Sequence, residues 1–260
     1  MGERVCIFCG RAPVTREHIF RKKLAEYVDN PRERVSRPGE DPDRSPLVFE
    51  RTVRRVCGAC NNGWMNDLEN AVEPVLINLI QARETVLKTA DAMLLAKWAV
   101  KTAIIRSFMD NDRSLSATET SYLYEHQKPR ASWFVVLGRT YTPALLDQTR
   151  HFRGHSSASV ASRGGDSNVH VQQHVLNIGE MLLISTSLVG PPEVVQRPRE
   201  VLRRIFLDQQ EYPFVELFPT PRTAEWPVAE SLTGEQMGDI IQIVPDMYEV
   251  LTGQIWDEEH

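Results

Sequence analysis

The sequence has no long hydrophobic run that is free of charge. Its longest apolar stretch, residues 92–109, is interrupted by Lys97, Lys101 and Arg106, so it predicts a helix of a soluble protein and not a membrane span. Residues 1–4 lead straight into a cysteine pair and lack the apolar segment of a secretory signal. We therefore expect a cytoplasmic protein with no membrane partner.

Cysteine is scarce, and none is left over. The chain has 260 residues but only four cysteines, which form two Cys-x-x-Cys pairs, Cys6 with Cys9 and Cys57 with Cys60. Two thiolates at this spacing reach one tetrahedral cation from a tight turn, and a second pair completes four sulfur ligands. The pattern predicts a structural Zn²⁺ site. Two disulfides or ordinary buried thiols are the alternatives, although disulfides would need an oxidising compartment.

Phosphate-binding loops are also missing. The chain has no internal repeat and no Gly-rich loop of the Walker or dinucleotide-binding type. The net charge of −5 argues weakly against nucleic acid, but residues 1–60 carry 13 Lys and Arg against 9 Asp and Glu, and the rest carries 17 against 26. A basic part joined to an acidic body is expected where only the basic part faces phosphates. An exposed arginine-rich loop would give the same balance.

The spacing of apolar residues predicts an α+β fold. Short strands are expected at residues 4–8 and 47–56, on either side of an exposed loop at 29–46. After the second cysteine pair the spacing becomes helical. Helices are predicted at 64–79, at 90–110, from a capping signal at Ser116 to near Pro129, from Pro198 to Phe206, and after a cap at Thr233; strands are predicted at 133–137, 156–161, 169–176 and 181–188, with a turn at 177–180.

These elements divide the chain into two predicted parts. Residues 1–72 would form a zinc-bound module, and residues 73–260 a larger domain of helices and antiparallel strands whose role is unknown. Within the second part, residues 73–129 are expected to be helical, 130–190 mainly β and 191–260 mixed.

Three polar residues stand at fixed places in the cysteine frame. Glu17 and His18 lie between the pairs, and Asn61 directly follows the last cysteine, at the start of a predicted helix. In this order of parts, residues 5 to 69 resemble the HNH endonuclease family, in its zinc-stapled branch. The chain is also similar to a group of bacterial HNH proteins whose C-terminal half has no established role. This similarity covers residues 57–69, 98–103 and 226–227.

The resemblance implies a ββα-metal fold that holds a divalent cation, Mg²⁺ or Mn²⁺, against a DNA phosphate. Glu17 and Asn61 would hold this cation, and His18 would be the general base that deprotonates the attacking water. The residue types suit these roles, because histidine has an ordinary pKa of about 6.5 and hard cations prefer carboxylate and amide oxygens. The candidate phosphate contacts are Arg16, Arg54 and Arg55.

Alternatives stay open for each role. Thr52 stands about where the family has the asparagine that orients the base, and Arg21 stands where many relatives have proline. Asn61 could simply cap its helix, and the arginines could pair with carboxylates. The chain would then be a non-catalytic zinc module that binds nucleic acid or a protein partner. A third alternative is an enzyme switched on by a protein or ligand bound through its C-terminal domain.

Two histidine pairs have a spacing that occurs in metal sites, namely His151 with His155 and His170 with His174. That spacing converges on one metal only in a helix, whereas four residues of a strand span about 13 Å. Both pairs lie in predicted strands, so we expect ordinary histidines and no second metal site there.

Overall fold

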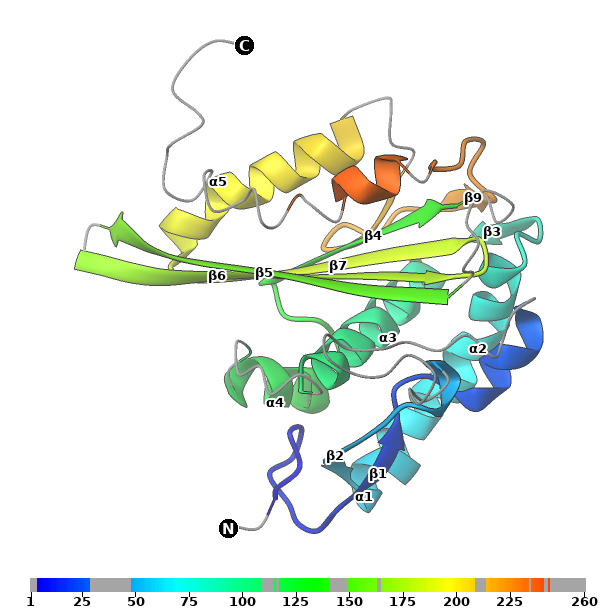
Figure 1. The fold of residues 1–260 in the computed structure, drawn as a ribbon, viewed down its shortest axis with the longest axis horizontal. Helices are drawn as coiled ribbons and strands as arrows, with labels where there is room; N and C mark the ends of the chain where they lie inside the picture. Colours follow the sequence, from blue (N-terminus) through cyan, green and yellow to red (C-terminus); the bar gives the residue numbers. More distant parts are fainter. Residues whose placement is uncertain are drawn as a thin grey trace.

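The computed structural model describes residues 4–28, 48–108, 115, 117–140, 149–162, 165–208, 214–233, 235–240 and 243. A five-stranded antiparallel sheet crosses the molecule, and helices cover both of its faces (Figure 1). The strands β1 and β2 and the short α1 lie below α3 in this view, and α2 runs upward beside α3. The chain is therefore of the α+β class that its sequence predicts. No helix in the described ranges has both the length and the apolar character needed to cross a bilayer.

The N-terminal elements lead up to the candidate site, and the later elements build the sheet and its covering helices. The N-terminal elements are β1 (Val14–His18), η1 (Lys22–Tyr27), η3 (Val48–Glu50), β2 (Thr52–Cys57), α1 (Gly58–Cys60), η4 (Asn61–Met65) and α2 (Asn66–Ile80). The later elements are β3 (Thr85–Leu87), α3 (Thr89–Ser107), α4 (Ala117–His126), β4 (Trp133–Arg139), β5 (Thr149–Ser162), β6 (Gly165–Ile178), β7 (Met181–Val189), α5 (Pro192–Arg203), η6 (Arg204–Asp208), β8 (Val215–Phe218) and β9 (Ala224–Trp226).

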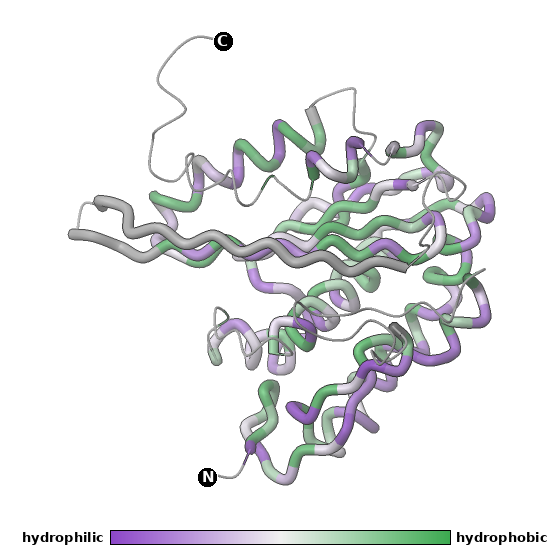
Figure 2. The backbone as a smooth tube through the Cα atoms, in the orientation of Figure 1, coloured by the Kyte–Doolittle hydropathy of each residue, from purple (hydrophilic) through white to green (hydrophobic). Residues whose placement is uncertain are grey.

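The sheet has the order β5-β6-β7-β4-β8 and separates two hydrophobic cores. Successive side chains of a strand point to opposite faces, and β4 is buried on both. Phe134 and Val136 join the core with α5, while Trp133, Val135 and Leu137 join the core that α3 and the N-terminal elements share. The central strands are accordingly hydrophobic over most of their length (Figure 2).

Helix α2 connects the N-terminal elements to the sheet. At its end, the carbonyl of Ile80 accepts a hydrogen bond from the backbone N–H of Glu180, at 3.0 Å, in the turn between β6 and β7. Gly179 in this turn has a φ of 55°, and a Cβ there would lie 2.4 Å from the Ile80 oxygen. Only glycine fits so close an approach at a positive φ. The turn expected at 177–180 is confirmed.

Four sequence expectations are wrong in part. The strand expected at residues 47–56 begins only at Thr52, because Val48–Glu50 form the short helix η3. Residues 4–8 do not form the expected strand: residues 4–6 have no regular structure, and residues 7–9 form a turn in which the N–H of Gly10 bonds back to the carbonyl of Cys6 at 2.9 Å. Helix α5 begins at Pro192 and not at Pro198, since either proline suits a first helical turn and Pro198 lies inside the helix. The region expected to be helical, 73–129, contains the short strand β3, which pairs with β9.

Candidate functional site

The four cysteine sulfur atoms form one cluster. All lie within 4.8 Å of one another, and Sγ of Cys9 and of Cys57 are 3.5 Å apart. Sulfurs held by one tetrahedral zinc, with Zn–S bonds of about 2.3 Å, would be about 3.8 Å apart. None of the four, all of which lie in the described ranges, forms a disulfide. The cluster is therefore compatible with a structural zinc.

The surroundings of the sulfurs also suit a metal. The first cysteine turn is tied to the second by a hydrogen bond from the N–H of Ile7 to the carbonyl of Arg55, at 2.9 Å. Burial opposes ionisation of Cys9, but hydrogen bonds from Arg11, Cys57 and Cys60 together outweigh it and lower the pKa of the thiol to about 6. Burial raises the pKa of Cys6 and Cys60. Zinc would deprotonate these thiols outright, because its ligand is the thiolate.

Strand β1 carries Glu17 and His18 and pairs antiparallel with β2. An undisturbed strand would point these two consecutive side chains to opposite faces. The register of the pair shifts between Thr15 and Glu17, while Glu17 and His18 themselves pair regularly with Val53 and Thr52 at the end of the strand. Here Glu17 and His18 line the same cavity. His18 lies directly opposite Thr52 in the pairing.

The helical side of the site contains a distortion. Residues 61–65 form a π-helical turn, and Gly63 within it departs from helical geometry, with φ −97° and ψ −118°. Turns of this kind occur often at functional sites. Asn61 ends the short α1, where its backbone N–H bonds to the carbonyl of Gly58, and no side-chain capping bond is made at the start of η4 or α2. The capping alternative for the Asn61 side chain is therefore not supported.

Glu17, His18 and Asn61 share a cavity of about 300 Å³. The structure thus brings together the three residues that the sequence pattern places in one site. A carboxylate, an imidazole and an amide lie here beside cationic side chains, and a hard divalent cation prefers such oxygens. The other residues of the lining are Arg16, Arg21, Lys22, Asn62, Met65, Asn66 and Glu69.

The sequence reasoning missed several residues of the lining, of which Glu69 carries the charge that the site needs. Its Oε1 accepts hydrogen bonds from Nε1 of Trp98, at 2.9 Å, and from Nζ of Lys101. Lys101 is fully buried, with an exposed fraction of 0%, and the Glu69 side chain is 12% exposed. A signal was present in the sequence, since Asn62, Asn66 and Glu69 follow the helical spacing that places residues on one face.

The pKa of Glu17 is far above its ordinary value. Burial raises it to about 7, and the nearby Glu69 carboxylate adds to the rise while Lys101 opposes it. A carboxyl group so shifted releases its proton near neutral pH, which couples cation binding to proton release.

The pKa of His18 is lowered, whereas that of Glu17 is raised. Burial lowers its pKa, and the positive charges of Lys22 and Arg16 lower it further, while Glu50 opposes them. The imidazole is therefore neutral at physiological pH and able to accept a proton.

The three candidate arginines lie in different places. Arg16 is exposed and lines the cavity with His18, whereas Arg54 is exposed on β2. The guanidinium of Arg55 lies over the ring of Phe108, 5.9 Å from its centroid, and lines another cavity. Only Arg16 therefore adjoins the predicted base.

Arg21 is held by α2. Its guanidinium bonds to Glu73 at 2.7 Å and to Asn70 at 2.6 Å, and Lys23 reaches the other oxygen of Glu73 at 2.5 Å. These contacts fix the segment after His18 against the helix that carries Glu69.

The raised pKa of Glu17 predicts an unusual stability profile. Between its ordinary value of 4.5 and about 7, the unfolded chain ionises this group while the folded chain keeps it protonated, so stability falls as pH rises. Without added Mg²⁺ or Mn²⁺, Glu17→Gln should therefore stabilise the protein at pH 8 by up to about 3 kcal/mol, and little at pH 5. Urea unfolding at both pH values measures the difference.

Glu73→Gln is the matched control for this prediction. Lys23 and Arg21 lower the pKa of Glu73, so this carboxylate contributes stability that is present above its ordinary pKa and lost in acid. Its replacement should destabilise the protein, and more at pH 8 than at pH 5, whereas Glu17→Gln should stabilise it at pH 8. A Glu17→Gln protein with the pH profile of the wild type would contradict the raised pKa of Glu17.

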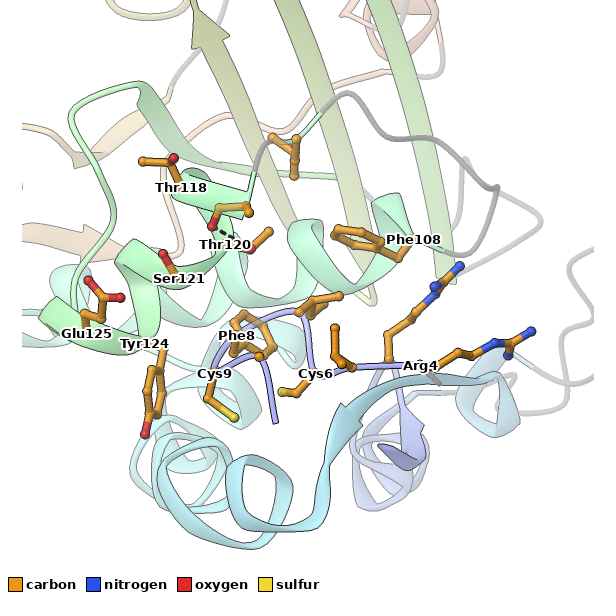
Figure 3. Close-up of a pocket in the computed structure, with 16 residues that line it drawn as sticks. Arg4, Cys6, Phe8, Cys9, Phe108, Thr118, Thr120, Ser121, Tyr124 and Glu125 are labelled. Atoms are coloured by element: carbon orange, nitrogen blue, oxygen red, sulfur yellow. Dashed lines mark hydrogen bonds between the residues drawn. The ribbon is translucent and has the colours of Figure 1, made fainter. Parts of the chain in front are cut away.

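A larger cavity, of about 930 Å³, lies on another side of the cysteine turns. Figure 3 shows Arg4 at one end of it and Tyr124 and Glu125 of α4 at the other, with Cys6 and Cys9 between them. Its polar groups are mainly hydroxyls and guanidinium groups. It lacks, among the described residues, the combination of imidazole, carboxylate and amide found in the smaller cavity.

The second histidine pair lies as expected in extended backbone. His170 and His174 belong to β6, and Nε2 of the buried His174 is 3.3 Å from Oγ of Ser107 on α3. His151 and His155 lie in β5. Both pairs therefore lie in strands, where histidines four residues apart are too far apart to share one metal.

Comparisons of the chain with protein-family models, with curated proteins and with solved structures find no match in any of the three. Function is therefore inferred from the chemistry of the site itself.

Proposed function

We propose that this chain is a metal-dependent HNH-type endonuclease that hydrolyses phosphodiester bonds in DNA. The observation that carries the proposal is the cavity shared by Glu17, His18 and Asn61 next to the cysteine cluster. A base, oxygen ligands for a cation and cationic side chains are what hydrolysis of a phosphodiester requires. Glu17 and His18 come from β1, which pairs with β2, and Asn61 comes from the helical segment η4; the resemblance implies such a combination of paired strands and a helix.

Each residue has a role that follows from its chemistry. Glu17 and Asn61 would hold a divalent cation through their oxygens, and this cation would supply a Lewis acid for the phosphate. His18, neutral because its pKa is lowered, would take the proton of the attacking water. Arg16 at the rim of the cavity would bind a neighbouring phosphate.

The strand pair supports the orientation of His18. Thr52 lies opposite His18 in the antiparallel pairing, which is the place that the resemblance assigns to the residue that orients the base. A backbone group at this position would serve whichever side chain it carries. The replacement of asparagine by threonine is therefore compatible with a functional base.

The proposed zinc would serve the chemistry indirectly. Asn61 directly follows Cys60, so a metal held by the four sulfurs would fix the start of the helix and with it the amide oxygen. The catalytic arrangement needs such fixing because small misplacements of a reacting group cost large factors in rate.

The purified zinc-loaded protein should convert supercoiled plasmid DNA to nicked or linear forms when Mg²⁺ or Mn²⁺ is added. Gel electrophoresis measures the conversion, and the same sample with EDTA is the control. No conversion by a folded, zinc-loaded protein with either cation would contradict the proposal.

A non-catalytic zinc module is the second candidate. The position of Arg55 favours it, since this arginine and Arg4 line the larger cavity beside the cysteines and not the cavity of His18. DNA binding that weakens steeply with salt, with no cleavage in any divalent metal, is the result expected for this candidate.

A further inference from the structure

Only one of the two oxygens of the Glu69 carboxylate accepts hydrogen bonds within the described part of the chain. Trp98 and Lys101 both donate to Oε1, while Oε2 is buried and has no hydrogen-bond partner among the described residues. A buried carboxylate oxygen without a partner is costly. Glu69 lines the same cavity as Glu17 and Asn61, so a ligand in that cavity would satisfy the free oxygen.

The charges in this part of the protein do not balance. Glu17 and Glu69 supply two carboxylates, and the buried Lys101 supplies one ammonium group, which acts on both of them. With both carboxylates ionised, these three buried or half-buried groups carry a net charge of −1, and a divalent cation would turn it into +1, to which the cationic Arg16, Arg21 and Lys22 of the lining add. Such a positive centre attracts a phosphate, whereas the uncompensated carboxylate would repel one.

We propose that Glu69 is a further protein ligand of the divalent cation, through Oε2, and that Trp98 and Lys101 hold its carboxylate in place. This inference rests on the proposed function for the cation site itself. The two donors on Oε1 fix the carboxylate, as the outer partners of metal ligands commonly do. Lys101 also keeps the cation-free site from carrying two uncompensated negative charges.

Glu69 differs from the other paired glutamates in its position. Glu119 uses both carboxylate oxygens, since Arg130 binds Oε1 and Ser132 binds Oε2, each at 2.6 Å. Glu216 accepts a hydrogen bond from Arg203 on Oε1, at 2.7 Å, and its buried Oε2 has no partner among the described residues, so an unpartnered oxygen alone does not mark a ligand. Glu69 has such an oxygen and also lines a cavity with Glu17 and Asn61, which Glu216 does not.

Titration calorimetry of the full-length, zinc-loaded protein with Mn²⁺ tests the proposal without any nucleic acid. Glu69→Gln should weaken Mn²⁺ binding at least about tenfold, as should Glu17→Gln. Glu73→Gln is the matched control, because this glutamate lies one turn further along α2, pairs with Arg21 and Lys23 and does not line the cavity. It should leave Mn²⁺ affinity within about twofold. Wild-type affinity in Glu69→Gln would overturn the proposal.

Lys101→Met gives a second readout that remains informative if Glu69→Gln is unstable. Removal of the buried ammonium leaves two carboxylates uncompensated, so Mn²⁺ should raise the Tm of this variant more than it raises the Tm of the wild type. A Mn²⁺-induced shift in Tm no larger than that of the wild type would count against the ligand role.

Failure of this inference is separable from failure of the proposed function. Cleavage of plasmid by the wild type together with unchanged Mn²⁺ binding in Glu69→Gln overturns the role of Glu69 alone. Mn²⁺ binding that depends on Glu69, in a protein that cleaves no nucleic acid, supports the role of Glu69 and overturns the nuclease.

Discussion

His18→Ala is expected to lower the rate of plasmid cleavage by about 100- to 10,000-fold, the range that a positioned general base contributes. His18 is the imidazole in the cavity with Glu17 and Asn61, and burial lowers its pKa so that it is neutral and ready to accept a proton. The initial rate of loss of supercoiled plasmid, at saturating Mg²⁺ or Mn²⁺, measures the effect.

His126→Ala is the matched control for this experiment. His126 is exposed at the end of α4 and does not line the cavity of His18, so its replacement should leave the rate unchanged. Mn²⁺ affinity should also survive in His18→Ala, since the proposed ligands are intact. Cleavage by His18→Ala at the rate of the wild type would exclude this residue as the base.

Cys57→Ser is expected to remove bound zinc and to lower the Tm by about 10 °C or more. Structural zinc contributes about 10–16 kcal/mol in isolated zinc-finger peptides, which is comparable to the whole stability of a typical protein. Even a fraction of that contribution is worth many degrees in a chain of this size. Elemental analysis and thermal unfolding measure the two effects.

Cys57→His provides a comparison within the same site. A set of three cysteines and one histidine also holds structural zinc, so this variant should keep more zinc and a higher Tm than Cys57→Ser. One zinc ion per wild-type chain is the expected starting point. A wild-type protein without zinc, folded and stable, would refute the metal cluster.

The parts of the site that the sequence predicts are those set by short spacing. Each Cys-x-x-Cys pair makes its own turn, and Asn61 follows its cysteine by one residue, so their relative positions need little tertiary information. The cap at Thr233 is another local signal, confirmed by hydrogen bonds between Thr233 and Gln236 of 2.9 and 3.3 Å. Signals of this kind survive in the folded chain because their partners are neighbours in sequence.

The parts that the sequence does not predict depend on distant partners. Lys101 interrupts an apolar stretch and so suggests a solvent-exposed edge of the helix, yet it is fully buried because Glu69, 32 residues away, receives its charge. Strand β3 exists because Thr85 pairs with Trp226. The spacing of apolar residues over a short stretch of sequence carries no information about either of these long-range contacts.

The contact between Glu69 and Lys101 also has a practical consequence for dissection of the protein. A fragment ending at residue 72 would cut α2 after Val72 and would lack α3, which supplies both Trp98 and Lys101. Glu69 would then face the solvent without the two donors that hold it. Every residue that lines the cavity would be present in this fragment, but Glu69 would lack its two hydrogen-bond donors, so a fragment meant to test the proposed site has to include α3.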